Sequence, residues 1–390
     1  MKIGIVLSKV PSYSETFFVS KIKGLQQHGH AVILFVQSGD EVFDLCPVKT
    51  AFPVYKRNVV KQLWWILKVF LLFIRHFKVC LRFVQTERSH GTGWFGVFKK
   101  LYVNMHILTE KLDWLHFGFA TMALGKEHVA KAIKAKMAVS FRGFDMAIYP
   151  IKHPNCYKTL WEQVDKVHTI SNDLYQLALA NGLSSEIPFQ KITPAIDISN
   201  FNEVVVDHQN SIERIKIMTV ARLHWKKGLT YTLQALKLLK DSGVKFQYTL
   251  VGEGEEYEKL MYIRAKLDLV EEVDFIGKVS HREVKELLNQ HQVYLQYSIS
   301  EGFCNAALEA QAMGLLCIVS DAEGLSENVL DGKSGWVVPK RVPEKLAARI
   351  VEVHALEKEV KKQIIDFAVN RVQQEFNLEK QQDEFVTFYS

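Results

Sequence analysis

The chain has 390 residues, of which 48% are hydrophobic and 24% charged, and these values exclude a disordered or fibrous protein. Its five cysteines are scattered and form no Cys-x-x-Cys pair, which argues against a disulfide framework and against a zinc site. Residues 1–100 hold fifteen Lys or Arg against five Asp or Glu, so the basic excess is local and does not indicate nucleic-acid binding.

The N-terminal residues begin with a short apolar run that reads as a first strand, because it is too short for a signal peptide. From there, apolar runs alternate with helix-length amphipathic segments, a pattern that predicts an α/β protein with parallel sheets. The expected strands are Lys2–Leu7, Ala31–Val36, Trp114–Phe117, Ala138–Phe141, Val167–Ile170, Ile215–Val220, Gln247–Val251, Val273–Ile276, Val293–Gln296 and Leu316–Val319.

A polar stretch without periodicity, residues 200–212, separates the two halves. We therefore expect a domain over 1–200 and a second domain over 201–375, each Rossmann-like, with a cleft between them. Residues 376–390 are expected to form a helix that packs back on the first domain. Ligands should bind in loops at the carboxyl ends of the strands.

A basic amphipathic segment spans residues 56–84 and lacks acidic side chains. Lys61, Lys68, Arg75 and Arg82 recur every seven residues, which predicts one stripe of cations on a single helix. Its charge-free runs are far shorter than the roughly 20 residues that span a bilayer. The segment favours peripheral association with an anionic membrane. The alternative is a core-packed helix with a solvated stripe.

The candidate site centres on residues 301–309, where a strand leads through a loop into a small-residue helix. Gly302 permits a tight turn, and the N-terminus of the helix can bind a phosphate or a sugar hydroxyl. Glu309 lies among alanines, and a buried carboxylate requires a hydrogen-bond donor, which a pair of sugar hydroxyls would supply. An ion pair with Arg or Lys on a partly exposed helix face is the alternative.

Two cations, Arg222 and Lys227, follow the strand Ile215–Val220 and can converge on a polyphosphate, although two solvated loop cations would look the same. Gly252 and the segment Ile276–Lys278 follow two further strands and offer backbone groups, which is a weak signal alone. The chain contains no Asp-x-Asp triplet, so we expect no metal and no cofactor.

Together these motifs carry a specific resemblance. Arg222 with Lys227-Gly228, Gly252-x-Gly254, Gly277, Glu301-x₇-Glu309 and Glu323-Gly324-x-x-Glu327 occur in the order typical of glycosyltransferase family 4, which the chain resembles over nearly its whole length. The resemblance implies the GT-B fold, with two Rossmann-like parallel-sheet domains that face a cleft. It also implies a nucleotide-sugar donor and retention of anomeric configuration.

The same resemblance assigns roles in the second half. Arg222 and Lys227 would hold the donor diphosphate, Glu309 the ribose, and Glu301 the donor hexose. Backbone groups at Gly302, Phe303, Cys304 and Asn305 would reach sugar and phosphate, and Gly252, Ile276 and Lys278 would face the nucleobase.

In the first half, residues 11–17 resemble the first loop of exopolysaccharide transferases, which places Ser14 and Glu15 on the acceptor side. His116 matches a histidine at the end of a family strand, and we count it as catalytic, although a lone histidine is more often a structural one whose hydrogen bonds are satisfied within the protein. Arg142 replaces the histidine of the family's His-Gly-x-Asp segment, and it would hold an acceptor phosphate or the reacting sugar.

We therefore expect a retaining, metal-independent transferase on the cytoplasmic face of the cell membrane. It would move a hexose from a UDP- or GDP-sugar to a lipid-linked or polysaccharide acceptor. A sugar-nucleotide epimerase of the same fold and a non-catalytic subunit of a polysaccharide assembly complex are the alternatives.

Overall fold

The structure, a computed structural model, describes residues 1–11, 16–39, 43–55, 57–201 and 214–390. The chain divides into two compact units, one formed by Met1–Ile192 with Gln381–Ser390 and the other by Thr193–Lys380. Ser14 and Glu15 lie outside the described residues.

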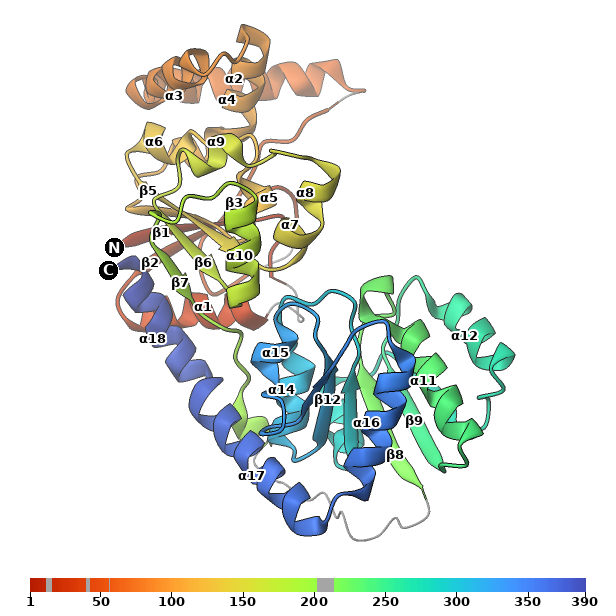
Figure 1. The fold of residues 1–390 in the computed structure, drawn as a ribbon. Coiled ribbons are helices and arrows are strands. Elements are labelled where there is room, and N and C mark those ends of the chain that lie inside the picture. The colour runs from red at the N-terminus through yellow and green to blue at the C-terminus, as the bar shows by residue number, and fades with distance from the viewer. Residues whose placement is uncertain (12–15, 40–42, 56, 202–213) are drawn as a thin grey trace. The chain divides into compact units, whose positions relative to one another are not determined.

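Unit 1 is built on a seven-stranded parallel sheet of order β3-β2-β1-β4-β5-β6-β7 (Figure 1). Its strands are β1 (Lys2–Leu7), β2 (Ala31–Val36), β3 (Val48–Thr50), β4 (Trp114–Phe117), β5 (Lys136–Phe141), β6 (Lys166–Thr169) and β7 (Phe189–Lys191). Its helices are α1 (Thr16–Gln27), α2 (Val59–Arg75), α3 (Phe77–Ser89), α4 (Trp94–Leu108), α5 (Ala120–Ala123), α6 (Val129–Ile133), α7 (Phe144–Ala147), α8 (Tyr149–Lys152), α9 (Lys158–Trp161) and α10 (Asn172–Ala180).

Unit 2 repeats this arrangement with a six-stranded parallel sheet of order β10-β9-β8-β11-β12-β13. Its strands are β8 (Ile215–Val220), β9 (Phe246–Val251), β10 (Val273–Gly277), β11 (Val293–Gln296), β12 (Leu316–Ser320) and β13 (Trp336–Val338). Its helices are η1 (Ile198–Phe201), η2 (Trp225–Lys227), α11 (Leu229–Asp241), α12 (Tyr257–Lys266), α13 (His281–Leu288), α14 (Asn305–Ala312), α15 (Leu325–Asn328), α16 (Pro343–Ala355) and α17 (Lys358–Glu375). The predicted class, α/β with two Rossmann-like parallel sheets, is confirmed.

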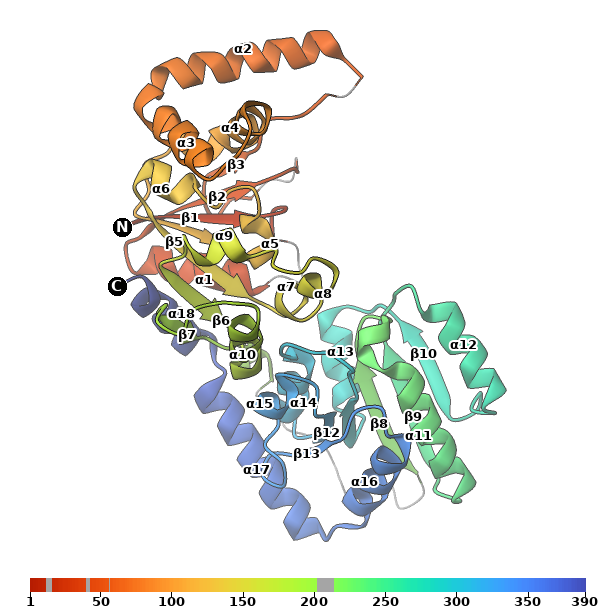
Figure 2. The ribbon, with the colours of Figure 1, turned by 45° about the horizontal axis from the view of Figure 1, so that its top comes forward.

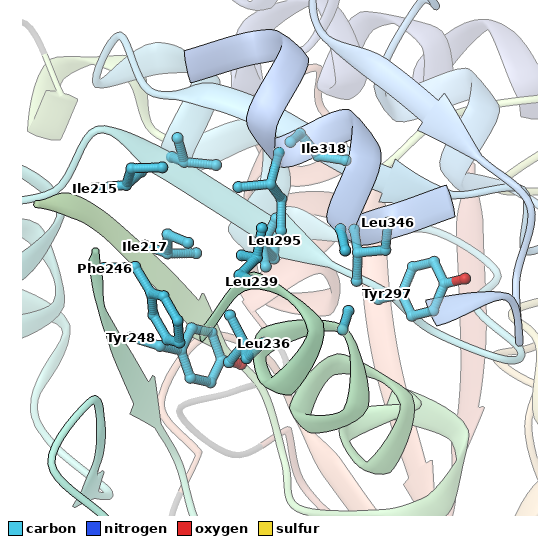
Figure 3. Close-up of a cluster of buried hydrophobic side chains, with 14 of the residues drawn as sticks. Ile215, Ile217, Leu236, Leu239, Phe246, Tyr248, Leu295, Tyr297, Ile318 and Leu346 are labelled. Carbon is cyan, nitrogen blue, oxygen red and sulfur yellow. The ribbon is translucent and has the colours of Figure 1, made fainter. Parts of the chain in front are cut away.

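The core of unit 2 explains why its strands read as continuous apolar runs. Both faces of a parallel sheet are covered by helices, so neither face alternates with polar residues. Figure 3 shows Ile215 and Ile217 of β8 packed with Leu236 and Leu239 of α11, and Leu346 of α16 belongs to the same buried cluster. In both sheets the strand order reverses beside the first strand, so the carboxyl ends of β8 and β11 lie side by side.

The prediction of one continuous helix over the basic segment is wrong. α2 ends at Arg75 and α3 begins at Phe77, because His76 leaves the helical conformation with φ −110° and ψ 31°. α3 is then fixed by Glu87, whose buried carboxylate accepts hydrogen bonds from His128, Lys100 and Thr92 at 2.8–2.9 Å. Arg82 therefore leaves the predicted cationic stripe, and its Nε donates to the carbonyl of Ala132 at 2.9 Å.

The last helix, α18 (Leu378–Tyr389), follows α17 after a break at residues 376–377. Phe385, Phe388 and Tyr389 of α18 are fully or almost fully buried in the apolar cluster of unit 1, together with Phe17 and Trp114. The C-terminal residues thus complete the unit that the N-terminal residues begin.

Candidate functional site

In unit 2, the candidate site lies in the loops that follow β8, β11 and β12. Gly228 brings the first two loops together, because it adopts φ +62° and a side chain there would place its Cβ 2.1 Å from the Tyr297 carbonyl oxygen. The backbone N–H of Ile299 donates to the carbonyl of Lys226 at 2.6 Å. These contacts hold the basic loop directly against the acidic one.

Lys227 and Glu301, which are 74 positions apart in sequence, form an ion pair in this loop cluster. Only 17% and 15% of their side chains are exposed, and the Ser298 hydroxyl donates to the same Glu301 oxygen at 3.2 Å. Burial acts to lower the pKa of Lys227, but the Glu301 charge and hydrogen bond outweigh it, so the pKa is raised. Lys227 is therefore a firmly protonated, half-enclosed cation.

Arg222 lies on the same loop, two residues after β8, and its side chain is exposed. Burial, assisted by the charge of Arg222, lowers the pKa of Lys226, and the same charge opposes the rise in the pKa of Lys227, so Arg222 lies near both lysines. The convergence of Arg222 and Lys227 on one diphosphate stays a prediction.

The position of Glu301 depends on the loop after β12, which sequence reasoning had used only as a motif. The Glu301 N–H donates to Glu323 Oε2 at 2.5 Å, and the Gly324 N–H donates back to the Glu301 carbonyl at 2.9 Å. Lys340 Nζ lies 3.8 Å from the other oxygen of Glu323.

Residues 302–305 form the turn into α14, and a buried side chain fixes its shape. Asn328 accepts a hydrogen bond from the Cys304 N–H at 2.9 Å and donates to the Cys304 carbonyl at 3.0 Å. Phe303 and Cys304 are buried, whereas Gly302 and Asn305 are partly exposed. The Cys304 N–H is already engaged, whereas Gly302 and Asn305 are partly exposed. Of the four predicted residues, these two are therefore the better placed to contact a ligand.

Glu309 has the hydrogen-bond partner that its burial requires, and this partner was missed. His281, the first residue of α13, places Nε2 3.2 Å from Glu309 Oε1, while the Glu309 side chain is 14% exposed. The hydrogen bond to Glu309 raises the pKa of His281. His281 is 28 positions from Glu309 in sequence, so no local spacing connects the two.

The three predicted nucleobase residues lie at the ends of β9 and β10. Gly252 adopts φ +138° and donates its N–H to the Gly277 carbonyl at 2.8 Å, which joins the two strand ends. Ile276 is 46% exposed. Lys278 is solvent-exposed and lies 3.4 Å from Glu253, so its side chain is free to reorient.

In unit 1, Arg142 follows β5 and its guanidinium stacks 3.9 Å from the centroid of the Phe17 ring. The buried Asp145 fixes this loop by accepting hydrogen bonds from the backbone N–H groups of Arg142 and Gly143, both at 3.0 Å. Arg142 is half-buried. It is thus held by a rigid loop at a strand end, where side chains of such folds meet ligands.

His116 lies in a different setting, within the sheet on β4, and it is fully buried. Its Nε2 lies 2.7 Å from the Ser140 hydroxyl, and its Nδ1 lies 2.5 Å from the Tyr389 hydroxyl and 3.0 Å from Lys21 Nζ. Burial and the adjacent Lys21 lower the pKa of His116 well below its usual value. The structure therefore separates His116, inside unit 1, from Arg142, at the end of a strand.

No group of three or more His, Cys, Asp or Glu side chains is placed to hold a metal ion among the residues that the structure describes. Within the same residues, no helix combines the length and the apolar character needed to cross a membrane.

Comparison with known proteins identifies the family to which this chain belongs. Residues 201–370 match the family model described as Glycosyl transferases group 1. WcaL of Salmonella typhimurium is named for colanic acid biosynthesis. It is 30% identical to this chain over an alignment of 403 positions, which covers 97% of this chain and 96% of WcaL. The amylovoran biosynthesis glycosyltransferase AmsK of Erwinia amylovora is 29% identical over 271 residues, covering 67% of this chain and 66% of AmsK. The chain belongs to the group 1 glycosyltransferases, and it is a transferase enzyme.

Solved structures agree with this membership at the level of the fold. A glycosyltransferase from Rickettsia africae superposes with a TM-score of 0.73 at 18% identity, covering 100% of this chain and 97% of its own. The Anabaena protein HepE, solved with UDP and glucose, gives 0.69 at 16% identity and covers 99% and 98% of the two chains. Both likenesses support the GT-B arrangement of two Rossmann-like domains.

Proposed function

We propose that this glycosyltransferase moves a hexose from a UDP- or GDP-sugar to a lipid-linked or polysaccharide acceptor during assembly of an exopolysaccharide. The polysaccharide acceptor is supported by the names of WcaL and AmsK, which refer to colanic acid and amylovoran. A UDP-linked donor is supported by HepE, which was solved with UDP-glucose.

The observation that carries the proposal is the half-enclosed, protonated Lys227 held against Glu301 where β8 and β11 end side by side. A diphosphate placed there would meet Lys227, the exposed Arg222 and the positive N-terminal end of α14. Glu301 would orient the donor hexose, and Glu309 would accept hydrogen bonds from the ribose hydroxyls.

Retention of configuration follows in this proposal from attack on the same face as the departing diphosphate. The main catalytic contribution of the protein would be electrostatic, because Lys227 and Arg222 stabilise the charge that develops on the leaving group. These fixed cations take the place of a metal ion, so we propose a metal-independent reaction. In unit 1, Arg142 is the better candidate to contact the acceptor, since it is half-buried at a strand end whereas His116 is fully buried.

The test is transfer of a labelled hexose by the purified protein, with and without EDTA. We expect activity in EDTA, and we expect Lys227→Ala and Glu309→Ala each to lower kcat/KM by more than about tenfold. Lys266→Ala removes an exposed cation of α12 and should leave activity unchanged. Full activity in both site variants would refute the site, and donor conversion without any acceptor would favour an epimerase.

We also propose that α2 binds the protein to an anionic membrane surface. Val69 is its buried residue, and its exposed apolar face consists of Val59, Val60, Leu63, Trp64, Ile66, Leu67, Phe70, Leu71 and Ile74. At about 100° per residue, Lys61, Lys68 and Arg75 lie along one edge of this face. Figure 2 shows α2 as the outermost helix of unit 1.

The charge and the aromatic side chains of this face support a membrane surface as its binding partner. No acidic residue occurs between residues 57 and 86, and Lys68 Nζ lies 3.5 Å from the centroid of the Trp64 ring. An apolar face edged by lysine and tryptophan suits the boundary between acyl chains and anionic headgroups. A membrane surface would bring the enzyme to a lipid-linked acceptor.

Sedimentation with liposomes tests this surface. We expect the wild type to pellet with vesicles that contain anionic lipid, and we expect reversal of Lys61, Lys68 and Arg75 to Glu to release it. Reversal of Lys266, Lys358 and Lys362, three exposed cations of unit 2, is the matched control and should preserve binding. A wild type that stays in the supernatant, or a triple variant that still pellets, would exclude the membrane role.

A further inference from the structure

His281 and Glu309 form a partly exposed pair, with 41% of the histidine side chain and 14% of the glutamate side chain accessible. His281 opens α13, where the Ser280 hydroxyl accepts from the Glu283 N–H and the Glu283 carboxylate accepts from the Ser280 N–H, which makes a full capping box. The imidazole also packs edge-on against the buried Phe201, with the ring centroids 5.6 Å apart. The ring is therefore fixed by its helix terminus and by an aromatic neighbour.

A ring fixed in this way fixes the carboxylate that it contacts. Nε2 of His281 lies 3.2 Å from Oε1 of Glu309, which engages one of the two carboxylate oxygens. A free carboxylate on a long side chain rotates, and it loses that freedom when it binds a ligand. Here one carboxylate oxygen is already engaged, which restricts the side chain before a ligand binds, and 14% of the side chain remains exposed to a ligand.

We infer that His281 is a positioning residue that orients Glu309 toward the vicinal hydroxyls of a ribose, and that it thereby sets a preference for ribonucleoside over 2′-deoxyribonucleoside diphosphates. This inference rests on the ribose role proposed for Glu309. A pre-oriented carboxylate gains most from a ligand that offers both hydroxyls, because each hydroxyl then donates without reordering the acceptor.

The charges around His281 determine how the preference for ribose depends on pH. Glu309 faces it from α14, and Phe201 from η1 is uncharged. On its own helix, Arg282 pairs with Glu286, and Glu283 is engaged with Ser280. Because the pKa of His281 is raised, the charged pair is complete below the usual histidine pKa and is lost as the pH rises through the raised value. The ribose preference should fall over the same range.

The experiment is calorimetric titration of the full chain with UDP, GDP and their 2′-deoxy forms. We expect the wild type to prefer the ribose form of the nucleotide that it binds by about tenfold or more. His281→Ala should lose most of this ratio by weakening the ribose form alone. His281→Asn keeps a hydrogen-bond donor and should restore part of the ratio without its pH dependence, and Arg282→Ala should match the wild type.

The outcomes distinguish a failure of this inference from a failure of the proposed function on which it rests. If His281→Ala weakens both forms equally, or neither, the residue does not orient Glu309 for ribose and the inference fails alone. If the wild type binds neither UDP nor GDP, the proposed function fails first and the inference falls with it. A histidine titration by NMR in Glu309→Gln provides a ligand-free check, since loss of the pair should lower the pKa of His281.

Discussion

Gly228 shows how a single backbone position joins the two loops of the candidate site. It ends η2 directly after Lys227 and opens α11, and its φ of +62° lies in the left-handed region that side chains disfavour. The Tyr297 carbonyl, four positions before Glu301, occupies the space that a Cβ would need. The approach of Lys227 to Glu301 therefore depends on the absence of a side chain at this position.

Substitution at Gly228 should accordingly cost more than its backbone conformation alone. Gly228→Ala would combine the left-handed strain of about 1 kcal/mol with overpacking against a backbone atom, for a total of roughly 3 kcal/mol or more. Gly243→Ala is the matched control, because Gly243 adopts φ +78° with no atom within 4 Å of the added Cβ. Thermal unfolding of the two variants measures the difference. Equal melting points would show that the loops can separate without cost.

The site residues differ in how far the sequence alone predicted them. The requirement of Glu309 for a donor followed from a carboxylate within a helix of small side chains, and Arg222 and Lys227 followed from their place after a strand. His281 and Asn328 were not predicted, because each acts through a contact between elements distant in sequence. His116 was predicted at the end of a strand from a motif, and the motif carried no information about its burial on β4.

Among the elements, the central strands were the most predictable. The expected strands Lys2–Leu7, Ala31–Val36, Ile215–Val220 and Val293–Gln296 agree with β1, β2, β8 and β11 at both ends. The three-residue strands β3, β7 and β13 were missed. Each lies at a sheet edge and pairs on one side, so it needs few apolar residues and leaves little pattern to detect.

The division of the basic segment into α2 and α3 could not be predicted from periodicity. Its apolar residues continue at helical spacing through His76, so the pattern contains no stop signal such as Gly or Pro. The break is caused by tertiary contacts, since Phe83 and Glu87 of α3 are fully buried against other elements of unit 1. α2 is left with an apolar face that the described part of unit 1 does not cover, and this face motivates the membrane proposal.

At the scale of the whole molecule, the chain crosses between its two units twice. It leaves unit 1 after Ile192 and returns at Gln381, so residues close to the C-terminus stabilise the N-terminal unit. Phe385 of α18 is fully buried, and its ring centroid lies 5.3 Å from that of Phe17 and 5.1 Å from that of His168. Lys21 Nζ lies 4.4 Å from the same ring. Phe385 thus covers the buried polar cluster that contains His116.

Removal of this ring should destabilise unit 1 although the residue lies only five positions from the C-terminus. Phe385→Ala is expected to cost about 3–5 kcal/mol, because it leaves a cavity beside a buried lysine. Phe367→Ala is the matched control, since Phe367 lies on α17 of unit 2 and is 44% exposed. Hydrogen exchange followed by mass spectrometry locates the effect. Faster exchange in β1 and β4 than in β8 would confirm that α18 is part of the core of unit 1, whereas equal acceleration in all three strands would mean that the two units unfold together.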